Sequence, residues 1–324
     1  MDDKNGVHLF LPSYKKLKLF TGLAHPELAF EIASHLGIGV SAMRVDRFKD
    51  GEIRVAIDET VRGIDCFVVQ PTCPPVNDNL MELLIIADAM RRASAKTVTA
   101  VIPYYGYARQ DRKTRARDPI TAKLVANLLV TAGCDRVLTM DLHAGQIQGF
   151  FDIPVDPLLG MPILVKYVEE CGFTDCVIAS PDIGGTGRAR AMAEKLGVGL
   201  VVIDKRRPAP NVSEVMHIIG DVKGKTVVLV DDIIDTGGTI VQAAEALMDK
   251  GAKEVFAACT HALLSGRAKE VLSSSVLKKI IVTNTIPLTE DRRPERTEVL
   301  SVAPLMAEAI KRIYQDLPVS PLFE

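Results

Sequence analysis

The chain has 324 residues, a length that predicts about two domains. Its formal net charge is −2 at pH 7, so the chain as a whole has no positive field to attract nucleic acid or an anionic membrane. The first residues are polar, unlike a secretory signal peptide, and no apolar run approaches the ~20 residues that span a bilayer. The sequence therefore predicts a cytoplasmic protein that binds neither nucleic acid nor membrane.

Short apolar runs that favour strands alternate with helical patterns along almost the whole chain. The runs are continuous, which is typical of parallel strands covered by helices on both faces. Among the helices, Asp118 and Pro119 predict the cap and first turn of one that follows. This alternation favours an α/β fold with mainly parallel sheets. The predicted strands are Asp65–Gln70, Thr97–Pro103, Arg136–Asp141, Asp175–Ser180, Gly199–Asp204, Thr226–Asp231, Glu254–Cys259 and Lys279–Asn284.

A weak internal repeat covers one unit of helix, strand and loop. The segment Gly133–Ala144 aligns without a gap with the segment Gly251–Ala262. We therefore expect two similar α/β domains, residues 1–156 and 157–324, with the last dozen residues packing on the first domain. One large doubly wound sheet is the alternative.

The segment from Thr226 to Thr239 carries the strongest functional pattern. An apolar strand ends in Asp231 and Asp232, and a turn with two glycines then opens a helix. The N–H groups of such a turn and the positive end of the helix dipole bind phosphate, and the paired acids suit ribose hydroxyl groups. An ordinary strand–helix turn capped by an aspartate is the alternative, but it leaves the paired acids unexplained. The predicted phosphate loop consists of Asp235, Thr236, Gly237, Gly238 and Thr239.

This pattern resembles the phosphoribosyl-binding signature of the type I phosphoribosyltransferase fold. The segments Pro103–Arg112, Met140–Phe151 and Asp204–Pro208 are similar to ribose-phosphate pyrophosphokinases, and the resemblance extends from about Lys18 to Phe323. It implies two phosphoribosyltransferase-type domains, each a mainly parallel sheet flanked by helices. The implied reaction transfers the β,γ-diphosphate of MgATP to the 1-hydroxyl of ribose 5-phosphate. A phosphoribosyltransferase, or a non-catalytic regulatory subunit of the same family, is the alternative.

The resemblance also implies an ATP site to which two subunits contribute. His143 and Asp182 would be ligands of Mg²⁺, the expected cofactor. From the residues alone, His143 could instead be a local hydrogen-bonding side chain, and Asp182 the cap of a tight turn. The implied ATP-binding residues are Arg109, Gln110 and His143 of one chain, with Asp50, Gly51 and Glu52 of a neighbouring subunit.

A basic segment after the fifth predicted strand would supply the catalytic cations. The resemblance implies this role for Lys205 and Arg207, with Arg207 also contacting ribose 5-phosphate and Arg206 facing elsewhere. Cations near the equatorial oxygens stabilise phosphoryl transfer, whereas the residues alone would equally suit a solvated loop. The resemblance further implies a homohexamer with inorganic phosphate and ADP as effectors. His261, which aligns with His143 in the repeat, is expected to be structural.

Overall fold

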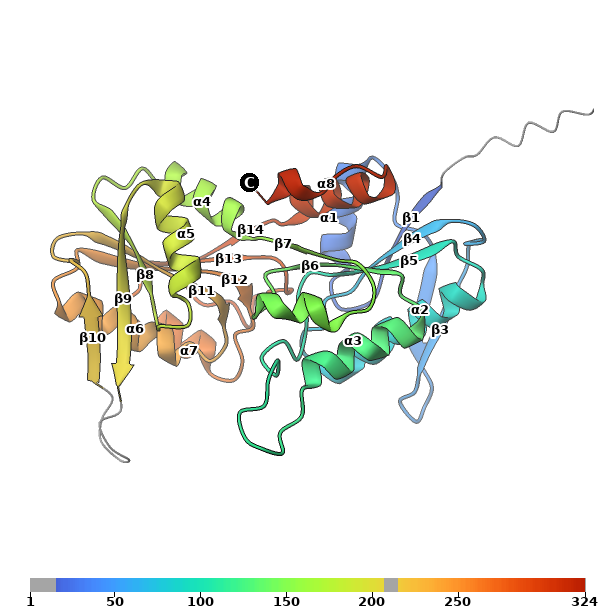
Figure 1. Cartoon of the computed structure of the whole chain (residues 1–324), viewed down its shortest axis with the longest axis horizontal. Helices are drawn as coiled ribbons and strands as arrows, with labels where there is room; N and C mark the ends of the chain where they lie inside the picture. Colours follow the sequence, from blue (N-terminus) through green and yellow to red (C-terminus); the bar gives the residue numbers. More distant parts are fainter. Residues whose placement is uncertain (1–15, 207–214, 324) are drawn as a thin grey trace, which may run out of the picture.

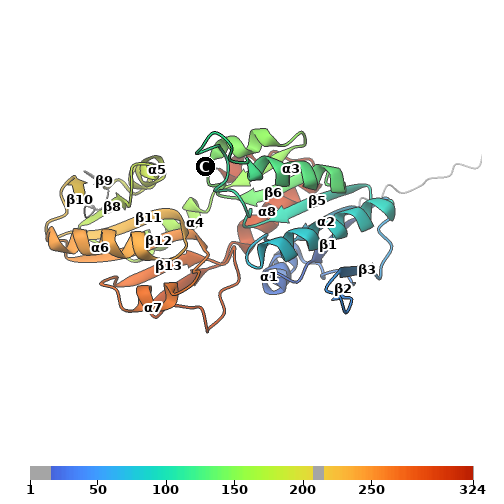
Figure 2. The same cartoon turned by 90° about the horizontal axis from the view of Figure 1, so that it is seen from below.

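The computed structural model describes residues 16–206 and 215–323. The chain forms two α/β units that lie side by side along the long axis of the molecule (Figures 1 and 2). Each unit has its own sheet, so the strands do not join into the single large sheet that was the alternative. No helix within 16–206 or 215–323 combines the length and apolar character needed to cross a membrane.

The first unit is built on a parallel sheet that helices cover on both faces. Its strand order is β1 (Leu17–Thr21), β4 (Asp65–Val69), β5 (Thr97–Ile102), β6 (Arg136–Met140) and β7 (Val155–Leu158). One face packs against α2 (Val76–Arg92), α3 (Thr121–Ala132) and the 3-10 segment η1 (Gly145–Phe150). The other face packs against α1 (Pro26–Leu36) and α8 (Ala303–Tyr314). The strands are largely buried, as their continuous apolar runs predict.

The second unit is built on a larger sheet of the same kind. Its strand order is β10 (Val215–Ile219), β9 (Gly199–Arg206), β8 (Cys176–Ser180), β11 (Thr226–Ile234), β12 (Glu254–Ala262), β13 (Lys279–Thr283) and β14 (Thr297–Leu300). Every neighbouring pair is parallel except β9 and β10. One face packs against α4 (Met161–Glu170) and α5 (Thr186–Leu196), and the other against α6 (Gly238–Asp249) and α7 (Ala268–Ser273). The predicted α/β class with mainly parallel sheets is confirmed.

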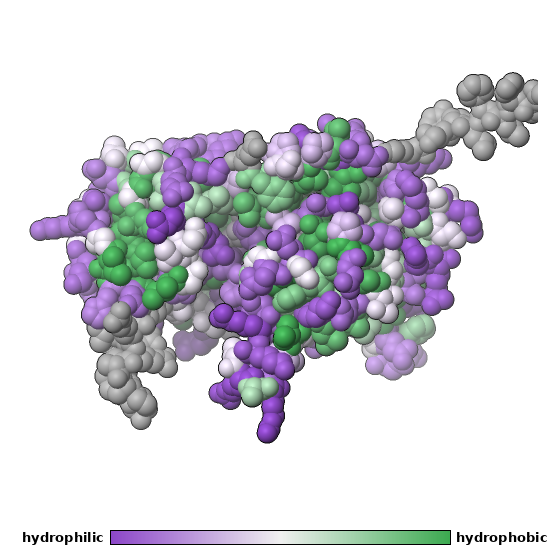
Figure 3. Space-filling view, viewed as in Figure 1, coloured by the Kyte–Doolittle hydropathy of each residue, from purple (hydrophilic) through white to green (hydrophobic). Residues whose placement is uncertain are grey.

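Three smaller features complete the chain. An antiparallel hairpin of β2 (Met43–Arg47) and β3 (Ile53–Ile57) lies on the side of the first unit away from the second (Figure 1). A short 3-10 segment, η2 (Ser320–Leu322), precedes the C-terminus. The loop between β5 and α3 forms a hydrophilic projection from the first unit (Figure 3).

The chain changes sheets after β7 and later returns to the first unit. The predicted domain boundary at residue 156 falls inside β7, which pairs with β6 as far as Leu158. From Val302 onward the chain packs on the first sheet together with α1, and Phe323 contacts the same cluster. The return therefore involves the whole of α8 as well as the last dozen residues.

The predicted cap of α3 is wrong. The helix begins at Thr121, with Ile120 rather than Asp118 at the N-cap position, and no side chain caps it. Asp118 instead accepts hydrogen bonds from Thr114 Oγ1 at 2.5 Å and from the Arg115 N–H at 2.8 Å. The aspartate closes a turn in the preceding loop, a role that its short polar side chain serves as readily as a helix cap.

Buried polar contacts hold the two units together. Asp141, at the end of β6, accepts hydrogen bonds through Oδ2 from Thr260 Oγ1 and from the Gly160 N–H. His261 donates through Nε2 to the Asp141 carbonyl at 3.1 Å and contacts Thr285 Oγ1 through Nδ1 at 2.9 Å. Burial lowers the pKa of His261, which favours the neutral ring. The expectation that His261 is structural is confirmed.

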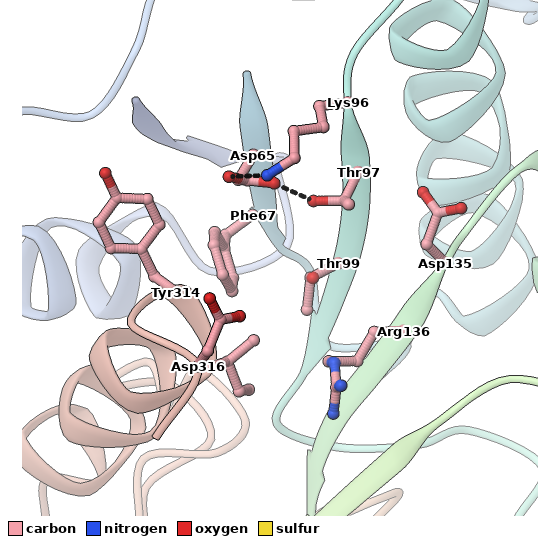
Figure 4. Close-up of a pocket in the computed structure, with 10 residues that line it drawn as sticks. Asp65, Phe67, Lys96, Thr97, Thr99, Asp135, Arg136, Tyr314 and Asp316 are labelled. Atoms are coloured by element: carbon pink, nitrogen blue, oxygen red, sulfur yellow. Dashed lines mark hydrogen bonds and ion pairs between the residues drawn. The ribbon is translucent and has the colours of Figure 1, made fainter. Parts of the chain in front are cut away.

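A polar cavity of about 230 Å³ lies where α8 meets the amino-terminal ends of β4, β5 and β6 (Figure 4). Its charged groups are paired within the protein. Lys96 Nζ and Thr97 Oγ1 contact the Asp65 carboxylate at 3.1 and 2.8 Å, and Arg136 contacts Asp156 at 2.6 Å. Ligands of parallel α/β sheets bind at the opposite, carboxyl edge of the strands. A ligand-binding site is therefore expected at that opposite edge.

Candidate active site

β11 carries two adjacent acids to the carboxyl edge of the second sheet. The predicted strand ends at Asp231, whereas β11 continues to Ile234, so both Asp231 and Asp232 lie within it. The extra length arises because β11 stays paired with β12 up to Ile234. Asp231 Oδ1 accepts a hydrogen bond from the Asp232 N–H at 2.8 Å. This contact folds the first carboxylate over the backbone of the next residue.

The turn between β11 and α6 has the form of an anion-binding loop. Gly237 has a φ of 80°, and a Cβ there would lie 2.9 Å from Leu272 Cγ, so the position requires glycine. A Cβ at Gly238 would meet no atom within 4 Å, so this side of the loop is open. No side chain caps α6, and its first N–H groups remain available to an anion. Because the N-cap position is Gly237, the alternative of Asp235 as helix cap does not hold.

Two contacts connect this strand and loop to the first unit. His143, in the loop after β6, contacts Asp232 Oδ2 through Nδ1 at 2.7 Å. Arg109, in the loop before α3, donates through Nη1 to Asp235 Oδ2, also at 2.7 Å. Residues that the family resemblance assigns to ATP therefore touch residues predicted to bind ribose 5-phosphate.

The charges at this junction affect one another. Burial and the neighbouring Asp232 carboxylate raise the pKa of Asp231. Burial also disfavours the ionised form of Asp232, but the hydrogen bond with His143 and the charge of Arg188 hold its pKa below the usual range. The same hydrogen bond raises the pKa of His143. Asp232, which contacts both His143 and Arg188, therefore holds its negative charge to a lower pH than Asp231 does.

Arg188 is a site residue that the sequence analysis did not identify. It lies on the first turn of α5, with its side chain 24% exposed. Nη1 is 3.5 Å from Asp231 Oδ1 and 3.3 Å from Asp232 Oδ1. The available signal was an arginine directly after the glycine-rich turn that opens this helix.

Asp182 lies in the turn between β8 and α5. Its Oδ1 accepts a hydrogen bond from the Gly185 N–H at 2.8 Å, and its carbonyl accepts one from Ser180 Oγ at 2.6 Å. The side chain therefore supports the turn, as the alternative interpretation proposes, yet the residue is exposed and one carboxylate oxygen suffices for this contact. Within the described part of the chain, no three His, Cys, Asp or Glu side chains cluster so as to hold a metal ion by themselves.

A cavity of about 320 Å³ lies beside Arg109 at the junction of the two units. Gln110 Oε1 accepts a hydrogen bond from Thr121 Oγ1 at 2.5 Å, which ties this loop to the start of α3. The cavity combines aromatic surface with a guanidinium group, a combination that suits a purine nucleotide. Its lining includes Tyr104, Tyr107, Arg109 and Gln110 from the first unit, and Leu263 and Ser265 from the second.

Known proteins share both halves of this arrangement. Residues 17–133 match the family model described as the N-terminal domain of ribose phosphate pyrophosphokinase, and residues 207–324 match the phosphoribosyl synthetase-associated domain. The ribose-phosphate pyrophosphokinases of Clostridium tetani and Clostridium acetobutylicum are 60% and 61% identical to this chain, over 96% of it and 98% of each relative. The chain belongs to the ribose-phosphate pyrophosphokinase family.

A solved structure supports the same conclusion. The phosphoribosylpyrophosphate synthetase of Mycobacterium smegmatis is 48% identical and has a TM-score of 0.89, covering 93% of this chain and 100% of its own. The present protein is accordingly an enzyme, a ribose-phosphate diphosphokinase.

Other residues that this family resemblance singles out lie apart from the junction. Asp50, Gly51 and Glu52 form the turn of the β2–β3 hairpin, where Asp50 Oδ1 accepts a hydrogen bond from the Glu52 N–H at 3.1 Å. The hairpin lies on the side of the first unit away from the second (Figure 1), and the Gly51 carbonyl accepts a hydrogen bond from Arg47 Nη1 at 3.1 Å. The contribution of Asp50, Gly51 and Glu52 to the ATP site of a neighbouring subunit stays a prediction.

The predicted catalytic cations fall at the edge of the described residues. Lys205 lies in β9 opposite Met216 of β10, and only its backbone is described. Arg207 lies outside the described residues. The roles of both residues stay predictions.

Proposed function

We propose that this enzyme transfers the β,γ-diphosphate of MgATP to the 1-hydroxyl of ribose 5-phosphate, giving 5-phosphoribosyl 1-diphosphate and AMP for nucleotide biosynthesis. The observation that carries the proposal is the pair of contacts His143–Asp232 and Arg109–Asp235, each 2.7 Å long. Direct transfer requires the two substrates to be held against each other. These contacts bring the residues proposed for each substrate to one place.

Ribose 5-phosphate would bind at the end of β11. Its phosphate would lie on the loop Asp235–Thr239, where the uncapped N–H groups of α6 and the hydroxyls of Thr236 and Thr239 can donate. Its ring hydroxyl groups would donate to Asp231 and Asp232. The open side of the loop at Gly238 leaves room for a phosphate group.

ATP would bind in the cavity beside Arg109, with Asp50, Gly51 and Glu52 of a neighbouring subunit completing the site. Arg109 and Gln110 would contact the nucleotide directly. The base would lie against the aromatic surface, and the phosphates would extend toward His143 and the acids of β11. This orientation is supported by the Arg109–Asp235 contact, which joins the cavity to the phosphate loop.

Magnesium is the proposed cofactor, and the residues present fit it. The side chain of His143 is 40% exposed, and its Nδ1 contact with Asp232 leaves Nε2 free to bind an ion. A carboxylate that contacts the other ring nitrogen in this way is common behind a metal-binding histidine. Asp182 would supply a carboxylate oxygen, and phosphate oxygens and water would complete the coordination, as is usual for magnesium. The bound ion would offset the negative charge of the triphosphate.

In the reaction itself, the ribose 1-hydroxyl would attack the β-phosphorus in line, and AMP would leave. Lys205 and Arg207 would lie over the transferring group and stabilise its developing charge, with Arg207 also contacting ribose 5-phosphate. Their closure would also exclude water, which would otherwise hydrolyse ATP.

The decisive experiment mixes the purified protein with ribose 5-phosphate and MgATP and measures AMP. We expect AMP release that depends on ribose 5-phosphate and equals the 5-phosphoribosyl 1-diphosphate formed. A phosphoribosyltransferase would release no AMP, and a regulatory subunit would be inactive. Adding inorganic phosphate or ADP to the same assay tests the proposed effectors.

We also propose that the enzyme is a cytoplasmic homohexamer. The proposal follows from the family resemblance, which assigns Asp50, Gly51 and Glu52 to the ATP site of a neighbouring subunit. Light scattering at the assay concentration should therefore show an oligomer. A fully active monomer would exclude a shared ATP site.

A further inference from the structure

The carboxylates of Asp231 and Asp232 lie close together although the two residues are adjacent on β11. Successive side chains of a strand point to opposite faces of the sheet, so Asp231 and Asp232 should diverge. Instead, the Asp232 N–H holds Asp231 Oδ1 at 2.8 Å, and Arg188 Nη1 lies within 3.5 Å of one oxygen of each carboxylate. A single guanidinium nitrogen thus brings the two carboxylates together.

The two carboxylates depend on this arginine to different degrees. Asp232 also contacts His143 at 2.7 Å. For Asp231, by contrast, Arg188 is the one cation within 4.0 Å among the side chains described for residues 16–204 and 216–323. Without the guanidinium, the Asp232 N–H would still hold Asp231 Oδ1, but no shared cation would draw the two carboxylates together.

The helix that carries the arginine is held firmly. Ala189, the neighbour of Arg188, is fully buried, as is Met192 one turn later, so the face of α5 that they form is anchored against the second sheet. The guanidinium group is planar and presents donors in a fixed geometry, which a lysine ammonium group does not reproduce. Arg188 is therefore suited to fix the direction of the carboxylates as well as to offset their charge.

We propose that Arg188 is a positioning residue for the ribose hydroxyl groups. It holds the carboxylates of Asp231 and Asp232 side by side, so that they accept hydrogen bonds from adjacent hydroxyl groups of one furanose ring. The inference rests on the proposed function, since it assigns the acid pair to ribose 5-phosphate. Arg188 acts on the substrate through these carboxylates.

The main test compares ribose 5-phosphate with 2-deoxyribose 5-phosphate in the wild type and in Arg188→Gln. In the wild type, loss of one hydroxyl group should lower kcat/KM, because an acid is left without its donor. In Arg188→Gln, KM for ribose 5-phosphate should rise by about 10-fold or more, while KM for MgATP stays within about twofold. The preference for ribose over 2-deoxyribose should shrink by a similar factor. Arg188→Lys should recover part of it, since the charge is kept and the geometry is not.

Two further variants act as controls. Arg190→Gln removes the same group from an exposed position on the same helix, and it should retain wild-type kinetics. Asp231→Asn should weaken ribose 5-phosphate binding on its own, and the double variant with Arg188→Gln should lose less than the product of the single losses, because both changes break one contact.

Several outcomes would overturn the inference. Arg188→Gln with wild-type discrimination between the two sugars would show that the arginine does not act through the acids. A loss confined to kcat would show that it contacts the transferring group instead. If Arg188→Gln does not fold, as judged by circular dichroism, then Arg188→Lys and Asp231→Asn decide the question by the same comparison. A wild-type protein that releases no AMP would reject the proposed function rather than this inference.

Discussion

Two adjacent glycines in the phosphate loop should respond to substitution in opposite ways. Gly238 is the first residue of α6, and a Cβ there would meet no atom within 4 Å. Gly238→Ala should therefore leave the free energy of unfolding unchanged or raise it by up to ~1 kcal/mol, because alanine favours a helix over glycine. A larger side chain, as in Gly238→Val, should also be tolerated by the fold.

Substitution of Gly238 should weaken the binding of ribose 5-phosphate even though the fold stays stable. The side chain at residue 238 would project into the space proposed for the phosphate of ribose 5-phosphate. A lost hydrogen bond to a charged group costs about 1.5–3 kcal/mol. At 1.36 kcal/mol per factor of ten, KM for ribose 5-phosphate should rise by about 10- to 150-fold in Gly238→Val. KM for MgATP should remain close to the wild-type value.

Gly237→Ala should show the reverse order of effects. The residue has a φ of 80°, and the left-handed conformation costs an L-residue roughly 1–2 kcal/mol. Its Cβ would also lie 2.9 Å from Leu272 Cγ in the core, and such overpacking costs typically ~1–3 kcal/mol. The variant should therefore lose about 2–5 kcal/mol of stability before any question of binding arises.

Chemical denaturation and steady-state kinetics on the same preparations separate the two effects. A Gly238→Val variant with normal KM for ribose 5-phosphate would show that the phosphate does not lie on this loop. A Gly237→Ala variant as stable as the wild type would contradict the steric argument, whatever its kinetics.

Three further predictions concern catalysis, the metal and stability. Lys205→Ala and Arg207→Ala should each lower kcat by at least ~10²-fold with nearly normal substrate binding, while Arg206→Ala keeps a kcat near that of the wild type. Steady-state kinetics and calorimetry of substrate binding measure these effects. A variant whose main defect is weaker ATP binding would contradict the catalytic role. His143→Ala should raise the magnesium concentration needed for half-maximal activity, so a magnesium titration that matches wild type would exclude His143 as a ligand. Burial raises the pKa of Glu82 above its ordinary 4.5, so between that value and the raised one the folded state holds a proton that the unfolded state has lost. Stability should fall as pH rises through this window and Glu82→Gln should flatten the fall, as measured by unfolding at several pH values.

The amino-acid sequence by itself determined the class of fold and the phosphate loop. Continuous apolar runs such as 226–230 predict buried parallel strands because a strand covered on both faces needs apolar side chains on both. This pattern can be recognised within a single strand. The paired acids followed by two glycines predict an anion-binding turn because all of these residues belong to one short segment of the chain. The structure keeps both features, apart from the three additional residues of β11.

A local sequence pattern does not determine the local structure where the same residues suit either a helix cap or a turn. Asp118 before Pro119 suits a helix cap, yet it closes a turn with Thr114 and Arg115, and α3 starts later. Both outcomes satisfy the same short side chain. The loop formed its own turn, and α3 begins at Thr121 without a side-chain cap.

Only the tertiary structure decided which residues meet. His143 and Asp232 are 89 positions apart in the chain, and Arg109 and Asp235 are 126 positions apart. No local pattern encodes such contacts, because they depend on how two separately formed sheets pack along their common boundary. Arg188 was overlooked for the same reason: an arginine on a helix is usually a surface residue, and it becomes part of the site only because α5 packs beside the end of β11.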